Sequence, residues 1–251
     1  ITYDDVTNVD SVGVITARNG IDVNAGGIDV NAGGINAVGI VTATSFSGED
    51  YLLSAIDTSI TDTAVDIFVY DTSKDSDGGA WRKRTQHTSW YNETLNTAIR
   101  GSRKEFPAVA VIVAETDTLT IYDGDDPDLP MWMVFTSGDA AGYTGPHINI
   151  ASGSTLSAVA ALNGEIVVTC NSGTYPFGSL QINFLKDRSL IRPDVGGKYS
   201  ITGIAKRNQT GSYNANYDYT ALVNKFANDV AMTVLPNAPI DDATGLPVPT
   251  I

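Results

Sequence analysis

The chain has 251 residues, and its 29 acidic side chains outnumber its 15 lysines and arginines, which gives a net charge of −14 at pH 7. This charge repels nucleic acids and anionic membranes, so we expect neither as a partner. A single cysteine, Cys170, excludes an internal disulfide, and no apolar run reaches the length of about eighteen residues that spans a membrane. We expect Cys170 to be buried and inert, because free cysteine commonly packs as a small apolar side chain.

A glycine-spaced heptad organises the N-terminal part of the chain. Glycines recur every seven residues at positions 13, 20, 27 and 34, and GIDVNAG occurs twice in tandem. Seven is also the coiled-coil period, but the alternating Ile-Asp-Val-Asn pattern and the glycines disfavour a helix. They favour a short strand followed by a tight corner. A flexible Gly-rich linker is the alternative, although a linker does not need phased Ile and Val.

One heptad carries too few apolar side chains to fold alone. At ~25 cal/mol per Å² of buried apolar surface, they cannot offset the entropy of ordering the backbone. The sequence therefore predicts that identical chains wind about a common axis, by analogy as a homotrimer, with Asp22 and Asp29 facing water. The side chains expected at this axis are Ile21, Val23, Ile28, Val30 and Ile35.

The sequence divides into a repetitive β stem over 1–50, a polar hinge over 51–64 and an all-β head over 65–251. In the head, short runs rich in Val, Ile, Thr and aromatic residues alternate with turn residues, which is typical of strands. The expected strands are Val65–Tyr70, Trp81–Thr85, Ala108–Ala114, Thr118–Tyr122, Met131–Phe135, Leu156–Ala161, Glu165–Cys170, Leu180–Leu185, Tyr199–Ala205 and Ala231–Leu235. Tyr219–Ala227 is a helix candidate, and Asn163-Gly164 predicts a hairpin turn. The head is expected to be propeller-blade-like, as an incomplete propeller, or sandwich-like.

Two acidic turns could bind a cation, although we expect no cofactor. Asp71, Asp75 and Asp77 stand at alternate positions, as at the start of a calcium loop, but Ser76 occupies the position that an EF-hand gives to glycine. The second turn contains Asp123 and Asp125, whose crowding could also raise one pKa for acid catalysis of glycoside cleavage. The simpler alternatives are a solvated hairpin turn between Val69 and Trp81 for the first three aspartates and capping of the turn backbone for Asp123 and Asp125.

Six of the fifteen basic residues lie between positions 82 and 104, close to several aromatic residues. The candidate contacts to an anionic glycan or an acidic partner are Arg82, Lys83, Arg84, Trp90 and Tyr91. Alternatively, the basic residues neutralise the loops around Asp75 and Asp125, and the aromatic residues fill the core. The sequence contains no nucleophile elbow, phosphate loop or dinucleotide fingerprint, and its two histidines lack metal-ligand spacing. We therefore expect no enzyme activity.

Several long phrases resemble the virion structural and tail-fibre proteins of marine bacteriophages, the cyanophage group especially. The phrases are Ile1–Arg18, Phe68–Thr85, Phe106–Phe135 and Val234–Pro239, so the resemblance recurs from the first residues of the chain to near its end. The resemblance implies a homotrimeric fibre on the virion, with β-propeller-like heads that meet the host surface. It implies no catalytic residues. The tandem heptad departs from the shorter stems that we associate with this family.

The sequence thus predicts a trimeric tail fibre or appendage that contacts other virion proteins and a host-surface glycan or protein. Two alternatives stay open. A polysaccharide-degrading tailspike would use carboxylates such as Asp123 or Asp125, and a pair facing each other across a groove at ~5–9 Å would favour it. A virion adaptor or capsid appendage would have no receptor contact.

Overall fold

The computed structural model describes residues 62–136, 155–172, 178–192, 198–208, 214–216 and 226–251. In these residues the chain forms two antiparallel sheets, which confirms the all-β prediction for the described part. The predicted stem at 1–50, nearly all of the hinge and most of the helix candidate lie outside the described residues. No described helix is long and apolar enough to cross a membrane.

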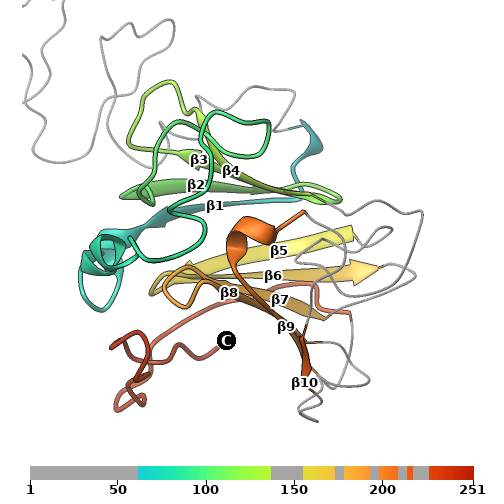
Figure 1. The fold of residues 1–251 in the computed structure, drawn as a ribbon. Helices are drawn as coiled ribbons and strands as arrows, with labels where there is room; N and C mark the ends of the chain where they lie inside the picture. Colours follow the sequence, from blue (N-terminus) through green and yellow to red (C-terminus); the bar gives the residue numbers. More distant parts are fainter. Residues whose placement is uncertain (1–61, 137–154, 173–177, 193–197, 209–213, 217–225) are drawn as a thin grey trace, which may run out of the picture. The chain divides into compact units, whose positions relative to one another are not determined.

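The first sheet is a four-stranded meander in the order β1-β2-β3-β4 (Figure 1). Its strands are β1 (Asp66–Asp71), β2 (Val109–Ala114), β3 (Thr118–Asp123) and β4 (Met131–Thr136). Strand β2 has the sequence VAVIVA and is apolar on both faces. Ile112 points into the main core, whereas Val111 and Val113 pack with Leu129 in a second apolar cluster.

The second sheet is a six-stranded meander in the order β10-β9-β8-β7-β6-β5. Its strands are β5 (Thr155–Leu162), β6 (Glu165–Ser172), β7 (Ser179–Asn183), β8 (Arg188–Arg192), β9 (Lys198–Thr202) and β10 (Asn214–Asn216). Asn163 and Gly164 close the β5–β6 hairpin with φ angles of 53° and 71°. Both angles are positive, as a two-residue Asn-Gly turn requires, so this predicted turn is confirmed.

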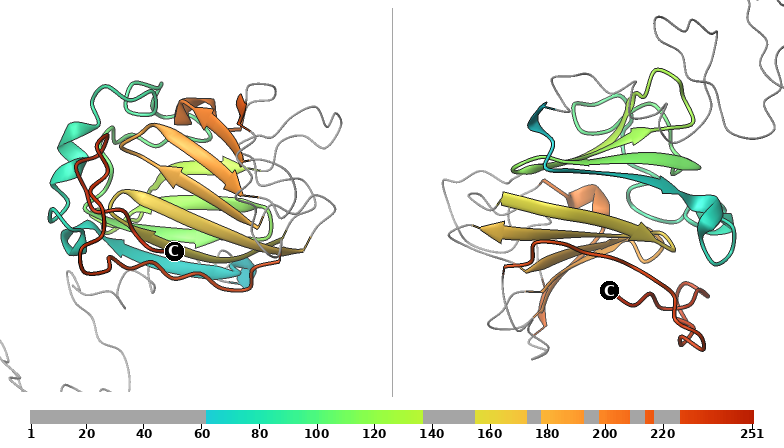
Figure 2. Two further views of the ribbon diagram at one scale, coloured as in Figure 1. Left: turned by 90° about the horizontal axis from the view of Figure 1, so that it is seen from below. Right: turned by 180° about the vertical axis from the view of Figure 1, so that it is seen from behind.

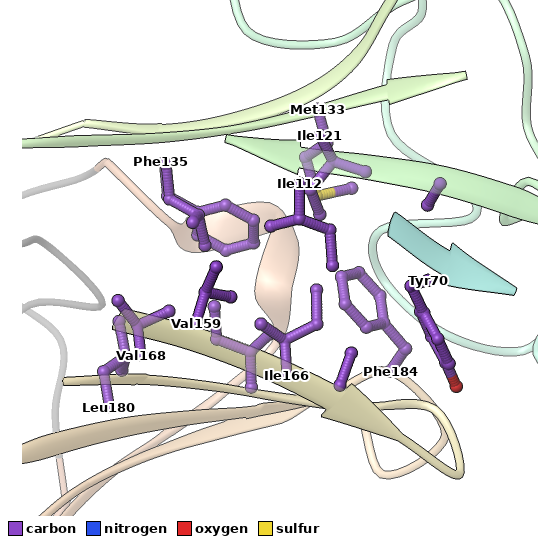
Figure 3. Packing of buried hydrophobic residues seen from close by; sticks show 14 of the residues in the cluster. Tyr70, Ile112, Ile121, Met133, Phe135, Val159, Ile166, Val168, Leu180 and Phe184 are labelled. Carbon is purple, nitrogen blue, oxygen red and sulfur yellow. The ribbon is translucent and has the colours of Figure 1, made fainter. Parts of the chain in front are cut away.

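The two sheets pack face to face around one core (Figures 1 and 2). In Figure 3, Ile112 and Ile121 from the first sheet point towards Val159 and Ile166 from the second. Cys170 is buried in the same core, as predicted. Two facing sheets are the arrangement of the sandwich-like alternative, whereas a propeller typically surrounds a channel with about four to eight blades.

Two of the predicted strands are wrong. Residues Ala80–Arg84 form a 3-10 helix that follows Gly79, which has a φ of 78°. Residues 231–235 make only an isolated bridge between Thr233 and Thr250. The predicted strand at 199–205 ends as β9 at Thr202. The sequence did not predict β8 or β10, because in β8 a short apolar pair is enclosed by two arginines and β10 is only Asn-Ala-Asn.

Candidate functional site

The candidate site lies on the long connection between β1 and β2, residues 72–108. Connections longer than about 12–15 residues are uncommon and usually functional in compact domains. This connection contains two short 3-10 helices, Thr72–Lys74 and Ala80–Arg84, and every predicted glycan or partner contact. Its buried aromatic residues close the core, whereas Lys83, Arg84 and Lys104 lie at the surface.

A buried carboxylate, that of Asp75, fixes the start of the connection. Asp75 Oδ2 accepts hydrogen bonds from Tyr70 Oη and Trp81 Nε1, both at 2.6 Å. Asp75 Oδ1 accepts the backbone N–H of Asn163 at 2.7 Å, and Gly164 N–H donates to Tyr70 Oη at 2.8 Å. The network therefore joins the end of β1 and the second 3-10 helix to the β5–β6 hairpin of the other sheet.

Burial governs the titration of both acidic members of this network. Burial raises the pKa of Tyr70 well above its ordinary value, and the charge of Asp75 adds to the shift. Burial also raises the pKa of Asp75, although the hydrogen bonds from Tyr70, Trp81 and Asn163 oppose that shift. Three groups of the protein donate hydrogen bonds to the Asp75 carboxylate, which supports a structural role for Asp75.

The other predicted cation ligands are also engaged by groups of the protein. Asp71 Oδ1 accepts Ser73 N–H, and Asp77 accepts Gly79 N–H and a hydrogen bond from Arg84 at 2.9 Å. Across the described ranges, no three His, Cys, Asp or Glu side chains are grouped as metal ligands.

Arg103 connects the acidic turn to the connection. Its Nη1 lies 2.8 Å from Asp123 Oδ1 and 2.6 Å from Asp125 Oδ2. Burial lowers the pKa of Arg103, but the two carboxylates outweigh it and the net shift is upward. Burial raises the pKa of Asp125, but Ala108 N–H, Val109 N–H and Arg103 outweigh it and the net shift is downward. The two carboxylates thus lie on one turn and bind the same guanidinium group. This contact is of the kind expected if the basic residues neutralise the loop around Asp125.

The three basic residues that were predicted to contact a ligand differ in how much of each side chain is exposed and free of contacts within the protein. Arg82 is half-buried and donates from Nη1 to Phe106 O at 3.1 Å. Arg84 is exposed, and it donates to Thr244 O in addition to its contact with Asp77. Lys83 is also exposed. The surface part of this basic run is therefore Lys83 and part of Arg84.

The two predicted aromatic contacts have opposite placements. Trp90 is fully buried, its Nε1 donates to Phe184 O at 2.9 Å, and its ring packs on Trp132 at 5.6 Å. Trp90 is thus a core residue and offers no surface to a glycan. Tyr91 is half-buried, with its ring edge-to-face on Trp90 and Lys104 Nζ 5.5 Å from its ring centre. Tyr91 and Lys104 form the aromatic and cationic part of the exposed surface.

Beneath this surface lies a buried ion group that the sequence did not predict. Glu93 binds Arg207 in a bidentate manner, at 2.7 and 2.8 Å, and lies 4.0 Å from Arg100 Nε. Arg100 and Arg207 are both fully buried, and Arg100 also stacks on Trp132 at 4.4 Å. Burial lowers the pKa of Arg100 to about 10, with Glu93 opposing the shift. Arg207 is 114 residues from Glu93, so no local sequence signal could reveal the pair.

Many of the polar side chains described above bind other groups of the protein. Ser89 Oγ likewise donates to Asp187 Oδ1 at 2.8 Å and accepts Ala205 N–H, with no histidine in that network. The predicted axis residues of the stem lie outside the described residues. No protein-family model, curated protein or solved structure matches this chain.

Proposed function

We propose that the chain is a structural and adhesive component of a phage virion fibre, in which a homotrimeric stem carries heads that attach to the host surface. The observation that carries the proposal is the glycine-spaced heptad, whose phased Ile and Val cannot be buried by one chain. The resemblance of the sequence to virion structural and tail-fibre proteins supports it. The all-β head is compatible with it, whether as a sandwich-like module or as blades of an incomplete propeller.

Attachment would rest on multivalency. The exposed surface of the connection offers Lys83, Tyr91 and Lys104, which suit an anionic glycan but form a small contact area. A single head is therefore expected to bind weakly. Several heads on one stem raise the effective concentration of each further contact, and overall avidity can exceed single-site affinity by about 10²–10⁴.

The native mass of the full chain in solution tests the proposal. We expect a trimer, and we expect Ile28→Asp to reduce its population because an aspartate would enter the shared axis. The matched control is Asp29→Ser, which changes the neighbouring residue that is predicted to face water. A monomeric wild-type chain, or equal effects of the two substitutions, would contradict the proposed stem.

A further inference from the structure

Most of the exposed large apolar side chains in the described part of the molecule belong to its last segment, residues 226–251, here called the C-terminal arm. Between 40% and 58% of each side chain is exposed in Phe226, Leu235, Ile240, Val248 and Ile251. Among the described residues outside the arm, only Val65 has a large apolar side chain with a comparable exposed fraction. Apolar exposure concentrated in one segment is typical of an interaction surface.

The arm is held in place on its own chain, so its apolar exposure does not result from a loose end. Within the arm, Thr233 and Thr250 exchange two backbone hydrogen bonds, at 3.0 and 2.8 Å, and at least three attachments join the arm to the rest of the chain. Leu246 is buried in the main core, and Asn163 Nδ2 donates to Pro247 O at 3.0 Å. An ion pair between Lys186 and Asp241 adds a third attachment. One side of the arm is thus docked, while its remaining apolar side chains face outward.

The charges of the arm indicate which partner it fits. The arm carries three acidic residues, of which Asp229 and Asp242 are exposed, and no lysine or arginine. It therefore repels nucleic acids, anionic membranes and anionic glycans. A complementary surface would combine exposed positive charge with an aromatic side chain. Residues 80–104 of this chain have that character, because Lys83, Arg84 and Lys104 are exposed and Tyr91 is half-buried. The one acidic residue in this range, Glu93, is already paired with Arg207.

We propose that the C-terminal arm of one chain docks on the β1–β2 connection of a second copy, against Lys83, Tyr91 and Lys104. This inference rests on the proposed trimer, because it requires copies held close together. A contact between two different surfaces is head-to-tail, and three such contacts can close a ring about a threefold axis. The interface would bury Leu235, Ile240 and Ile251 and would bring the aspartates of the arm near the lysines of the connection.

Footprinting of the full chain, after its native mass is measured, tests the docking. Hydroxyl radicals should modify Leu235, Ile240 and Ile251 several-fold more slowly than Val65, the exposed apolar reference outside the arm. Amine acetylation should likewise be slower at Lys83 and Lys104 than at Lys74, whose side chain is 66% exposed. A trimer in which the arm reacts as fast as Val65 overturns the docking but leaves the proposed stem intact. A monomer overturns both.

A substitution separates the docking from the stem. Ile240→Lys should leave the trimer mass and the tryptophan fluorescence unchanged, because Ile240 is 58% exposed within its own chain. It should restore fast modification of Leu235, Ile251 and Lys83, because a cation would face the lysines of the connection. Val65→Lys, the matched control, should leave their protection as in the wild type. Unchanged protection in Ile240→Lys, or equal loss of protection in the two variants, contradicts the inference.

Discussion

Replacing Glu93 by glutamine should strongly destabilise the fold, because Glu93 is the carboxylate partner of two buried guanidinium groups. Arg100 and Arg207 are fully buried, and the side chain of Glu93 is only 12% exposed. In the wild type, Glu93 accepts two hydrogen bonds from Arg207 and lies within 4.0 Å of Arg100. Glutamine retains one carbonyl acceptor, but it removes the negative charge that compensates the two cations.

Breaking a buried ion pair by removing one partner costs about 3–5 kcal/mol, mainly because the remaining charge is left uncompensated. We expect the lower end of that range, about 3 kcal/mol, because the glutamine carbonyl and several backbone carbonyls still accept from the arginines. Val134 O and Ile99 O accept from Arg207, and Trp132 O accepts from Arg100. A typical domain has a free energy of unfolding of about 5–15 kcal/mol, so the variant should still fold.

Denaturant unfolding followed by tryptophan fluorescence measures the effect, because Trp81, Trp90 and Trp132 are almost fully buried in the described core. The matched control is Glu105→Gln, which removes the same charge from an exposed position on the same connection. Substitutions at such surface sites usually stay within about 0.5 kcal/mol. If the two variants had equal free energies of unfolding, the argument that Glu93 compensates buried charge would be refuted.

Three further predictions concern the contacts around the connection. Asp75→Asn should lower the free energy of unfolding by about 1–3 kcal/mol, because the amide places a donor opposite the donors of Tyr70, Trp81 or Asn163. Asp71→Asn, at a half-buried position in the same segment, should have a smaller effect in the same denaturant assay. Gly164→Ala should also destabilise the fold by about 1–3 kcal/mol, because its Cβ would lie 2.3 Å from Leu185 Cδ1 at a φ of +71°; a wild-type midpoint of unfolding would contradict this. Protein donors lower the pKa of Asp125, so its contribution to stability is present above the ordinary carboxylate pKa of about 4 and is lost as the pH falls through the folded pKa. Asp125→Asn should therefore reduce the acid-induced loss of stability, and a loss equal to that of the wild type would contradict this reasoning.

Local sequence signals predicted most of the strands in the described residues. Short runs rich in Val, Ile and Thr, bounded by turn residues, identified β2, β3 and β6, and the Asn-Gly pair identified the β5–β6 turn. Each of these features depends on neighbours within a few residues. The wrong prediction of a strand at 81–85 also results from the use of local signals alone, because tryptophan is a residue type that is common in strands. In the fold, Trp81 belongs to a 3-10 helix, its ring lies in the core and its Nε1 donates to Asp75, a residue of the preceding turn.

The candidate site was predicted only in part, because long-range contacts determine which of its side chains are buried and which are exposed. Sequence proximity grouped Trp90 with Tyr91, yet one is in the core and the other is at the surface. Lys104 joins Tyr91 from farther along the connection, and its contact with the ring was not predicted. Arg84 was one of the candidate contacts to a ligand, but a carbonyl of the C-terminal arm accepts one of its N–H groups. No property of the local sequence indicates these partners.

The same contacts limit how the proposed attachment could work. Arg82 and Arg103 each use at least one N–H on the protein itself, and Arg100 is buried. Much of the basic run therefore supports the connection, and few cations remain for a ligand. A small exposed surface on a chain with a net charge of −14 gives little long-range attraction for an anionic glycan. Binding would then depend on several rigid heads acting together, and a stem that fixes their spacing becomes part of the binding mechanism.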